Sequence, residues 1–377
     1  MKKIALIHYQ PLEYYPPVTN FLDYLEKNLN HNIELKVFSS KNQHQRATHV
    51  SEKIVIKRSP FPKKNESSVV SFLKQIYFNI YTLLQLLNYK PDTILYYETY
   101  SALPAFFYLR FINKKAKLLI HFHEYFSKDW YEGGMKLVKL YHRIEVNFLF
   151  KRAYSISHTN EYRMKFFLAD YPFLNKDMLW VLPNYPPLVW SDQLKNKVLK
   201  FPGDEKELKL VYVGSLSLKA TYIKEFCTWL ASCKYKFTFD IYCFNLDPET
   251  SDYLNTLDMP QFNFYSSGIE YSGLPSVLQN YDIGVILYKG LSNNSKYCAS
   301  NKLFEYLACG LDVWFSDKML GTYPYITKKS YPKVIEVDFE NLASFDVYEA
   351  FNRDGLNMKD SIFFAENVYT KFLEELV

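Results

Sequence analysis

The chain has 377 residues, 48% of them hydrophobic and 23% charged, with a formal net charge of +5 at pH 7. This length exceeds that of one ordinary domain, so we expect two domains, each with a buried core. The longest uncharged run, residues 75–89, is shorter than the ~20 residues that a membrane span needs. The apolar run at the N-terminus stops at His8, which is too short for a signal peptide and typical of a buried strand.

Charge is distributed unevenly along the chain. Residues 1–190 hold 26 Lys and Arg against 15 Asp and Glu, a net charge of +11, whereas residues 191–377 hold 19 against 25, a net charge of −6. This contrast favours two domains and predicts that residues 1–190 meet an anionic membrane surface. The alternative is a chance spread of solvated lysines. We do not expect a nucleic-acid partner.

The cysteines indicate a reducing compartment. They are odd in number, form no CxxC pair and all lie in the second half of the chain: Cys227, Cys233, Cys243, Cys298 and Cys309. No Cys/His cluster has the spacing of a metal site. We therefore expect buried thiols, no bound metal and a cytoplasmic protein, peripheral at most on the inner face of the membrane.

In the first half, strand-like and helix-like segments alternate, which predicts a parallel sheet. The expected strands are 3–9, 33–39, 92–98, 116–124 and a short one near 154–159, and the expected helices are 18–29, 72–89 and 134–154. The helix 72–89 has an apolar face formed by residues 73, 76, 77, 80, 83, 84 and 87, and the helix 134–154 is basic and amphipathic.

Strand-like and helix-like segments alternate again after a polar segment, 191–207, which is interpreted as a linker. The expected strands are 208–214, 237–244, 282–288 and 312–317, and the expected helices are 222–233, 273–281, 300–310 and 361–376. We predict an N-terminal domain over 1–190 and a C-terminal domain over 208–377. The fold class is α/β with a cleft between the domains, and ligands bind at the C-terminal ends of the strands.

Several nucleotide and hydrolase motifs are absent. The sequence contains no GxGxxG, no Walker A motif, no GxSxG elbow and no DxD on an early strand, so the usual dinucleotide, P-loop and serine-hydrolase sites are not expected. One acid nevertheless stands out, Glu305 in "SNKLFEYLACG" (300–310). It lies at neither position that a capping box from Ser300 or Asn301 requires. An exposed pair with Lys302 is the alternative to a binding role.

Three segments, in order, resemble the donor half of GT-B glycosyltransferases, most closely the retaining family 4: "LVYVGSLSLKA" (210–220), "IEYSGLPSVLQNYDIGVILY" (269–288) and "SNKLFEYLACGLDV" (300–313). "HFHEY" (121–125) and "VLPNYP" (181–186) fall where that family has an interdomain histidine and an end-of-domain turn. The resemblance covers nearly the whole chain. It implies two Rossmann-like domains facing a cleft, with the C-terminal helix returning to the N-terminal domain. It also implies a nucleoside diphosphate sugar as co-substrate, with no cofactor and no bound metal.

The resemblance also implies roles for individual residues. The family's ribose-binding glutamate matches Glu305, and its diphosphate-binding lysine matches Lys219. Backbone N–H groups at a helix start can hold phosphate, which here means Asn301, Lys302 and Leu303. Gly214 would let the backbone approach the donor, and Ser215 follows it. The alternatives are a solvated lysine at 219 and an ordinary tight turn at 214.

On the acceptor side, the resemblance implies that His123 contacts the transferred sugar. His121 shares its face of the strand, and both could instead be satisfied core histidines. The turn "YQPLEYYPPV" (9–18) replaces the usual glycine-rich one. Its residues Gln10, Glu13 and Tyr14 could shape an acceptor site or could form a rigid proline-rich loop.

Two departures from the family pattern concern the donor site. Tyr297 stands where the family often has a second glutamate, and Ser215 stands where it has a basic residue. They weaken the expectation of a retaining mechanism. We expect a metal-independent hexosyl- or glycosyltransferase that acts on a glycan or lipid-linked glycan in bacterial surface polysaccharide synthesis, such as capsule or lipopolysaccharide. The alternatives are a non-catalytic GT-B subunit supporting a partner enzyme and a sugar-nucleotide 2-epimerase.

Overall fold

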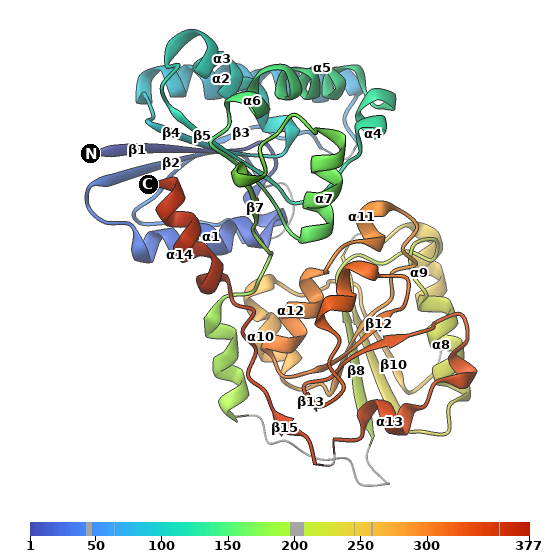
Figure 1. Cartoon of the computed structure of the whole chain (residues 1–377). Helices are drawn as coiled ribbons and strands as arrows, with labels where there is room; N and C mark the ends of the chain where they lie inside the picture. Colours follow the sequence, from blue (N-terminus) through green and yellow to red (C-terminus); the bar gives the residue numbers. More distant parts are fainter. Residues whose placement is uncertain (43–46, 64, 197–206, 245, 258, 354) are drawn as a thin grey trace. The chain divides into compact units, whose positions relative to one another are not determined.

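The computed structural model describes residues 1–42, 47–63, 65–196, 207–244, 246–257, 259–353 and 355–377. The chain forms two compact units, one of Met1–Asn184 with Ala365–Val377 and one of Tyr185–Phe364. Each unit has a parallel sheet with helices on both faces (Figure 1), which confirms the predicted α/β class. None of the helices within these described ranges is long and apolar enough to cross a membrane.

The sheet of the first unit has seven parallel strands in the order β3-β2-β1-β4-β5-β6-β7. They are β1 (Lys2–His8), β2 (Ile33–Ser40), β3 (Val55–Ser59), β4 (Thr93–Tyr97), β5 (Lys117–Phe122), β6 (Ser155–His158) and β7 (Leu179–Val181). The strand order reverses at β1, where Leu6 lies opposite Val37 of β2 on one side and Leu95 of β4 on the other. In such sheets ligands bind outside the carboxyl ends of the strands at this switch point.

Helices cover both faces of this sheet because side chains alternate along the buried strands. One face packs against α1 (Pro16–Asn28) and α14 (Ala365–Leu376). The other face packs against α2 (Ser68–Tyr89), α3 (Ala102–Phe107), the π-helical turns η3 (Tyr108–Ile112) and η4 (Glu145–Leu149), α6 (Phe150–Arg152) and α7 (Glu161–Asp170). The helices α4 (Lys128–Gly133) and α5 (Lys136–Ile144) precede η4.

The C-terminal helix α14 returns to the first unit, as predicted. The rings of Phe21 and Tyr369 lie 4.9 Å apart in an edge contact, and the Tyr369 hydroxyl donates a hydrogen bond of 2.9 Å to the Pro17 carbonyl. These contacts fix α14 beside α1 (Figure 1).

Helix α2 packs with its more polar side inward. Leu73, Ile80 and Leu84, on the apolar face predicted from the sequence, are 56%, 56% and 57% exposed. Asn79 is buried instead, and its amide donates bonds of 2.8 Å to the Gln75 carbonyl and to the Tyr141 hydroxyl of α5. The bond to Tyr141 satisfies the buried amide nitrogen, whereas the Asn79 amide oxygen has no hydrogen-bond partner among the described residues.

The second unit repeats the topology with six parallel strands in the order β10-β9-β8-β11-β12-β14. They are β8 (Leu208–Val213), β9 (Phe237–Tyr242), β10 (Phe262–Tyr265), β11 (Ile283–Ile286), β12 (Asp312–Ser316) and β14 (Val334–Val337), with a separate pair β13 (Ser330–Tyr331) and β15 (Asn357–Met358). The order reverses at β8, between β9 and β11. This unit therefore has a switch point of its own.

The helices of the second unit also divide between two faces. One face carries α8 (Ile223–Ser232), α9 (Pro248–Asn255) and α13 (Val347–Phe351), and the other carries α10 (Leu274–Leu278) and α12 (Asn301–Ala308) (Figure 1). The short helix α11 (Asn293–Lys296) precedes α12. None of the five cysteines forms a disulfide within the described residues, and Cys227, Cys243 and Cys309 are buried.

The boundary between the units differs from the predicted position at residue 190. The chain joins the second unit at Tyr185, whose ring packs 4.6 Å from that of Phe304 in an edge contact, and Trp190 is buried in the same core. The first part of the predicted linker 191–207 belongs to a 3-10 helix, Leu188–Asn196. Residues 197–206 of that linker lie outside the described residues.

Candidate active site

In the second unit, helix α12 is held against the switch point by Tyr306. The Tyr306 ring lies over Gly284 of β11, where any β-carbon would come within 2.2 Å of it. Its hydroxyl accepts a hydrogen bond of 3.2 Å from the backbone N–H of Val213, at the end of β8. The start of α12 is thus held beside the carboxyl ends of β8 and β11.

Gly214, Tyr288 and Lys302 meet at this point. Gly214 has a φ of +112°, and a β-carbon on it would lie 3.0 Å from Cε and 3.1 Å from Nζ of Lys302. The Lys302 ammonium is buried and donates a bond of 2.7 Å to the Tyr288 hydroxyl. Burial lowers the pKa of Lys302, but Tyr288 and Glu305 outweigh this and raise it overall, so the ammonium stays charged at neutral pH. A permanent positive charge therefore lies against the glycine turn.

Glu305 is one turn along the helix from Lys302 and only partly exposed. Burial raises the pKa of its carboxyl group to about 7, although the charge of Lys302 opposes this effect. The expected alternative, an exposed ion pair with Lys302, does not describe this site, because Lys302 is buried and bonded to Tyr288. A carboxylate held at this cost, without an ion pair in the described part of the chain, is suited to accept hydroxyl hydrogens from a ligand.

The other predicted donor-binding residues surround this cluster unevenly. Ser300 precedes α12 but its side chain does not cap the helix, so it does not occupy the first-turn N–H groups, which in general can hold an anion. Leu303 is buried, and its N–H bonds to the Ser300 carbonyl at 3.0 Å. Ser215 and Lys219 are exposed on the loop after β8.

In the first unit, histidines gather at the switch point between β1 and β4. The His123 ring, just past the end of β5, lies 6.2 Å from that of His8 and 4.7 Å from that of His121. It stacks at 5.2 Å on Tyr15 and at 5.3 Å on Tyr97. Burial, reinforced by the neighbouring His121 and His8, lowers the pKa of His123 well below its ordinary value. The imidazole is therefore neutral at pH 7.

His123 and His121 differ in how their ring nitrogens are satisfied. His121 Nδ1 is 2.8 Å from the Ser157 hydroxyl, as in a core histidine. Within the described residues, neither ring nitrogen of His123 has a partner with good hydrogen-bond geometry, and the nearby Asn184 only slightly favours its charged form. Buried polar atoms are usually paired, so the ring nitrogens of His123 retain capacity for a further hydrogen bond, as do those of the buried His158 of β6.

Glu98, which the sequence analysis did not single out, is the acid of this site. It follows β4 with φ +61° and ψ 153°, a backbone conformation that only glycine adopts without strain. Its Oε1 accepts bonds from the backbone N–H groups of His123 (2.6 Å) and Glu124 (3.3 Å). Burial, followed by repulsion from Glu124, raises its pKa to about 8. An acid ending a buried strand was visible in "ILYYE", but its backbone strain was not.

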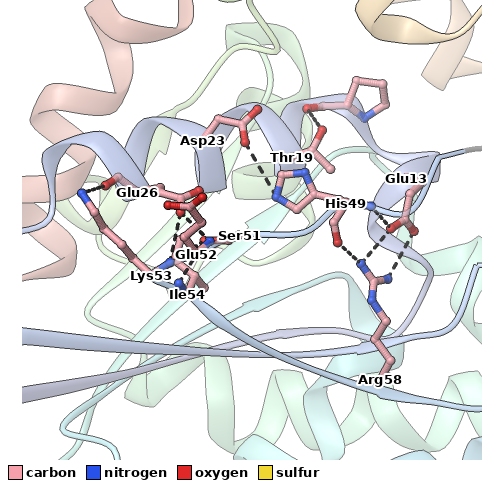
Figure 2. A network of polar contacts seen from close by, with 11 residues as sticks. Glu13, Thr19, Asp23, Glu26, His49, Ser51, Glu52, Lys53, Ile54 and Arg58 are labelled. Atoms are coloured by element: carbon pink, nitrogen blue, oxygen red, sulfur yellow. Dashed lines mark hydrogen bonds and ion pairs between the residues drawn. The ribbon is translucent and has the colours of Figure 1, made fainter.

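The predicted acceptor-side residues play different parts. Glu13 forms a two-pronged ion pair with Arg58, with contacts of 2.7 and 3.3 Å, and also accepts the His49 backbone N–H at 2.9 Å (Figure 2). Its carboxylate thus ties the turn after β1 to β3. The carbonyl of Gln10 is bonded to Ser39 and lies 2.7 Å from His8 Nδ1, and Tyr14 packs edge-on to a phenylalanine.

Two further points concern the expected chemistry. Tyr297, at the position where the family often has glutamate, is partly exposed at the end of α11. Its carbonyl lies so close to Gly321 that a β-carbon there would approach it to 2.3 Å.

Among the described residues, no group of three His, Cys, Asp or Glu side chains could hold a metal ion.

No protein-family model and no curated relative matches the sequence. Solved structures do match it. The apo form of the lipopolysaccharide outer core galactosyltransferase WaaB is 15% identical, with a TM-score of 0.65 over 99% of this chain and 100% of that one. Anabaena Alr3699/HepE in complex with UDP and glucose is 12% identical, with a TM-score of 0.62 over 100% and 99%.

An enzyme of another class has a similar fold. UDP-GlcNAc 2-epimerase from Neisseria meningitidis, bound to UDP-GlcNAc, is 13% identical, with a TM-score of 0.59 over 100% of this chain and 99% of that one. At such low identities these likenesses establish the fold. The chain has the GT-B fold that its motifs predicted.

Proposed function

We propose that this protein is a glycosyltransferase that moves a sugar from a nucleoside diphosphate sugar to a hydroxyl group of a glycan or lipid-linked glycan. The observation that carries the proposal is the switch point of the second unit, where Gly214, Lys302 and Glu305 lie together. A close backbone approach, a fixed cation and a carboxylate without an ion pair among the described residues are groups that can hold a nucleotide. The structures of HepE with UDP and glucose make UDP the first nucleotide to test.

The donor would bind through its ribose and its diphosphate. The Glu305 carboxylate would accept hydrogens from the ribose hydroxyls, and the first-turn N–H groups of α12 would hold the diphosphate, aided by the exposed Lys219. In transfer, the acceptor oxygen forms a bond to the anomeric carbon as the bond to the diphosphate oxygen breaks, and the proton of the acceptor hydroxyl passes to the departing diphosphate. Lys219 and the N–H groups would stabilise the negative charge that the diphosphate gains. We propose retention of configuration and independence of metal, as the family 4 resemblance implies.

His123 would bind the sugar. A neutral imidazole can donate one hydrogen bond and accept another, and neither nitrogen of His123 has a partner of good geometry among the described residues. The same resemblance suggests a place in bacterial surface polysaccharide synthesis. A lipid-linked acceptor would be met at the inner face of the membrane, where the predicted contact of residues 1–190 with anionic lipid would act.

The test is incubation of the pure protein with a panel of sugar nucleotides, with and without EDTA, while release of the nucleoside diphosphate is followed. We expect slow hydrolysis of one donor without any acceptor, changed less than about twofold by chelation, since the proposed charge stabilisation comes from protein groups. Failure to bind or hydrolyse any donor would favour the non-catalytic subunit. Loss of activity with EDTA that returns on adding a divalent cation would refute metal independence.

A second candidate is a sugar-nucleotide 2-epimerase, and one observation favours it. Such chemistry needs an acid/base group near the sugar, and the raised pKa of Glu98, about 8, lets it carry a proton at neutral pH. Nuclear magnetic resonance of the incubated donor separates the two functions. An epimerase equilibrates the donor with its 2-epimer and incorporates deuterium from heavy water at C2, whereas a glycosyltransferase leaves C2 unlabelled.

A further inference from the structure

The outer surface of helix α2 is an unusually apolar face on the first unit. Its exposed stripe follows helical spacing through Val69, Leu73, Tyr77, Ile80 and Leu84, which are 68%, 56%, 51%, 56% and 57% exposed. These positions recur every three or four residues, so they project from one side of the helix. The stripe extends about 22 Å at 1.5 Å per residue.

Neighbouring elements add more exposed apolar side chains. Helix α3 and the turn η3 present Phe107, Phe111 and Ile112, which are 38%, 65% and 53% exposed, and Leu140 of α5 is 51% exposed. The Phe107 and Phe111 rings stack at 6.0 Å. In Figure 1, α2, α3 and α5 form one layer on the face of this sheet opposite α1 and α14. Soluble monomers rarely leave a contiguous apolar patch of this kind uncovered.

The charges on these elements all have the same sign. Helices α2, α3 and α5 and the turn η3 contain Lys74, Arg110, Lys136, Lys139 and Arg143 but no Asp or Glu. Two acids from outside these elements pair with three of the cations, Glu66 with Lys74 and Glu132 with both Lys139 and Arg143. Arg110 and Lys136 are exposed. The apolar stripe is therefore flanked by basic side chains.

We infer that this face, the outward side of α2 with α3, η3 and α5, inserts into the headgroup region of an anionic lipid membrane. A helix that lies in the interface buries its apolar side among the acyl chains and places cations against anionic headgroups. The sequence alone assigned the membrane contact to residues 1–190 through their net positive charge. The structure adds α2, whose apolar side chains supply a contribution that salt does not screen.

A second copy of the chain fits this face less well. Dimers with two-fold symmetry bring the same patch of both copies together, so Arg110 and Lys136 would lie near like charges without an acid from these elements to offset them. An anionic bilayer supplies the opposite charge. The inference does not depend on glycosyl transfer, because it rests on surface residues outside both switch points.

The test is flotation of the full-length protein with phosphatidylcholine vesicles, with and without phosphatidylglycerol, at low and high salt. We expect binding to the mixed vesicles, with a fraction still bound at high salt. The variant Leu73→Glu/Ile80→Glu/Leu84→Glu should lower the partition coefficient at least roughly 100-fold. In the wild type three apolar side chains leave water on insertion, and in the variant they are replaced by charged ones. A matched control, Val50→Glu/Tyr348→Glu/Met358→Glu, changes residues that are 78%, 50% and 40% exposed elsewhere, and it should retain binding.

Three results would overturn the inference: no co-flotation of the wild-type protein, equal binding by the α2 variant, or a dimer in solution that the α2 variant dissociates. Circular dichroism melting of both variants verifies that they fold. Nucleotide binding measured by calorimetry should be the same in the wild type and the α2 variant. Failure of the membrane inference is thus distinguishable from failure of the proposed function.

Discussion

The two switch points have the same topology and opposite chemistry. In each unit the strand order reverses beside the first strand, at β1 and at β8. In the first unit this place holds neutral, buried histidines and the strained acid Glu98. In the second it holds the buried ammonium of Lys302 and a glycine with positive φ, Gly214.

The comparison indicates that the sheet topology sets the position of each site, at the reversal of strand order, and that the side chains there set which chemical groups the site can hold. A neutral imidazole with open nitrogens suits hydroxyl groups, as in a sugar, whereas a fixed cation beside helix N–H groups suits a diphosphate. If the two sites have these separate tasks, substitutions should separate turnover from nucleotide affinity.

The largest expected effect is on turnover, from His123→Ala. We expect kcat to fall roughly 100- to 1,000-fold, the size seen when one polar group is removed from a reacting centre, and the KM for the donor to change less than about threefold. Steady-state kinetics with the donor found in the panel measures both.

His121→Ala is the matched control, since His121 is equally buried but bonded to Ser157. It should lower the melting temperature and leave kcat within a few fold of wild type. If the two variants lost turnover equally, the proposed difference between His123, which would bind the sugar, and His121, which is bonded within the core, would be refuted.

The next effect is on nucleotide affinity, from Glu305→Ala. Losing a hydrogen bond to a charged group costs about 1.5–3 kcal/mol, or ~10–150-fold in Kd. Calorimetry with UDP and with uridine should show the loss for both, because the proposed contact is to the ribose. Undiminished affinity would assign Glu305 a role in folding alone.

The smallest effect is a pH dependence of nucleoside binding. The Glu305 carboxyl has a pKa of about 7 and must be ionised to accept two hydroxyl hydrogens. Uridine affinity should therefore fall up to about tenfold per pH unit below pH 7 and level off above it. Uridine is used because it has no phosphate that titrates in this range. Glu305→Gln should bind weakly at every pH, and an unchanged slope in this variant would contradict the assignment.

The same pKa predicts the opposite trend for stability. The folded value lies above the ordinary one of 4.5, so the folded state binds the proton more tightly, and stability is lost as pH rises from about 4.5 through 7. Glu305→Gln should thus be more stable than wild type at pH 8, by roughly 1–3 kcal/mol, and the gap should close near pH 4. Denaturant titrations at both pH values measure it.

Strong periodicity made much of the fold predictable from the sequence. The run "KIALIHY" predicted β1 to within one residue at each end, and helix α12 lies inside the predicted 300–310. Two strands with a weak hydrophobic pattern were not predicted. The edge strands Val55–Ser59 and Phe262–Tyr265 are short and partly exposed, so their hydrophobic signal is faint.

The site was less predictable because it depends on long-range packing. The sequence marked Lys302 as a donor-binding residue but not as a buried ammonium held by Tyr288, 14 positions earlier. The strain at Glu98 and the pairing of Glu13 with Arg58 likewise require segments distant in sequence. The exposure of the apolar face of α2 could not be predicted for the same reason. The opposite face is buried with Asn79, whose amide donates a hydrogen bond to Tyr141, 62 positions later in the sequence.

The most direct test of the central claim is hydrogen–deuterium exchange of the full-length protein with and without UDP. The account predicts slowed exchange in the loop 214–219 and in the first turn of α12, residues 301–303, with Glu305→Ala removing both effects at the same UDP concentration. Binding of UDP with protection confined to the first unit, or with no protection at either segment, would contradict it.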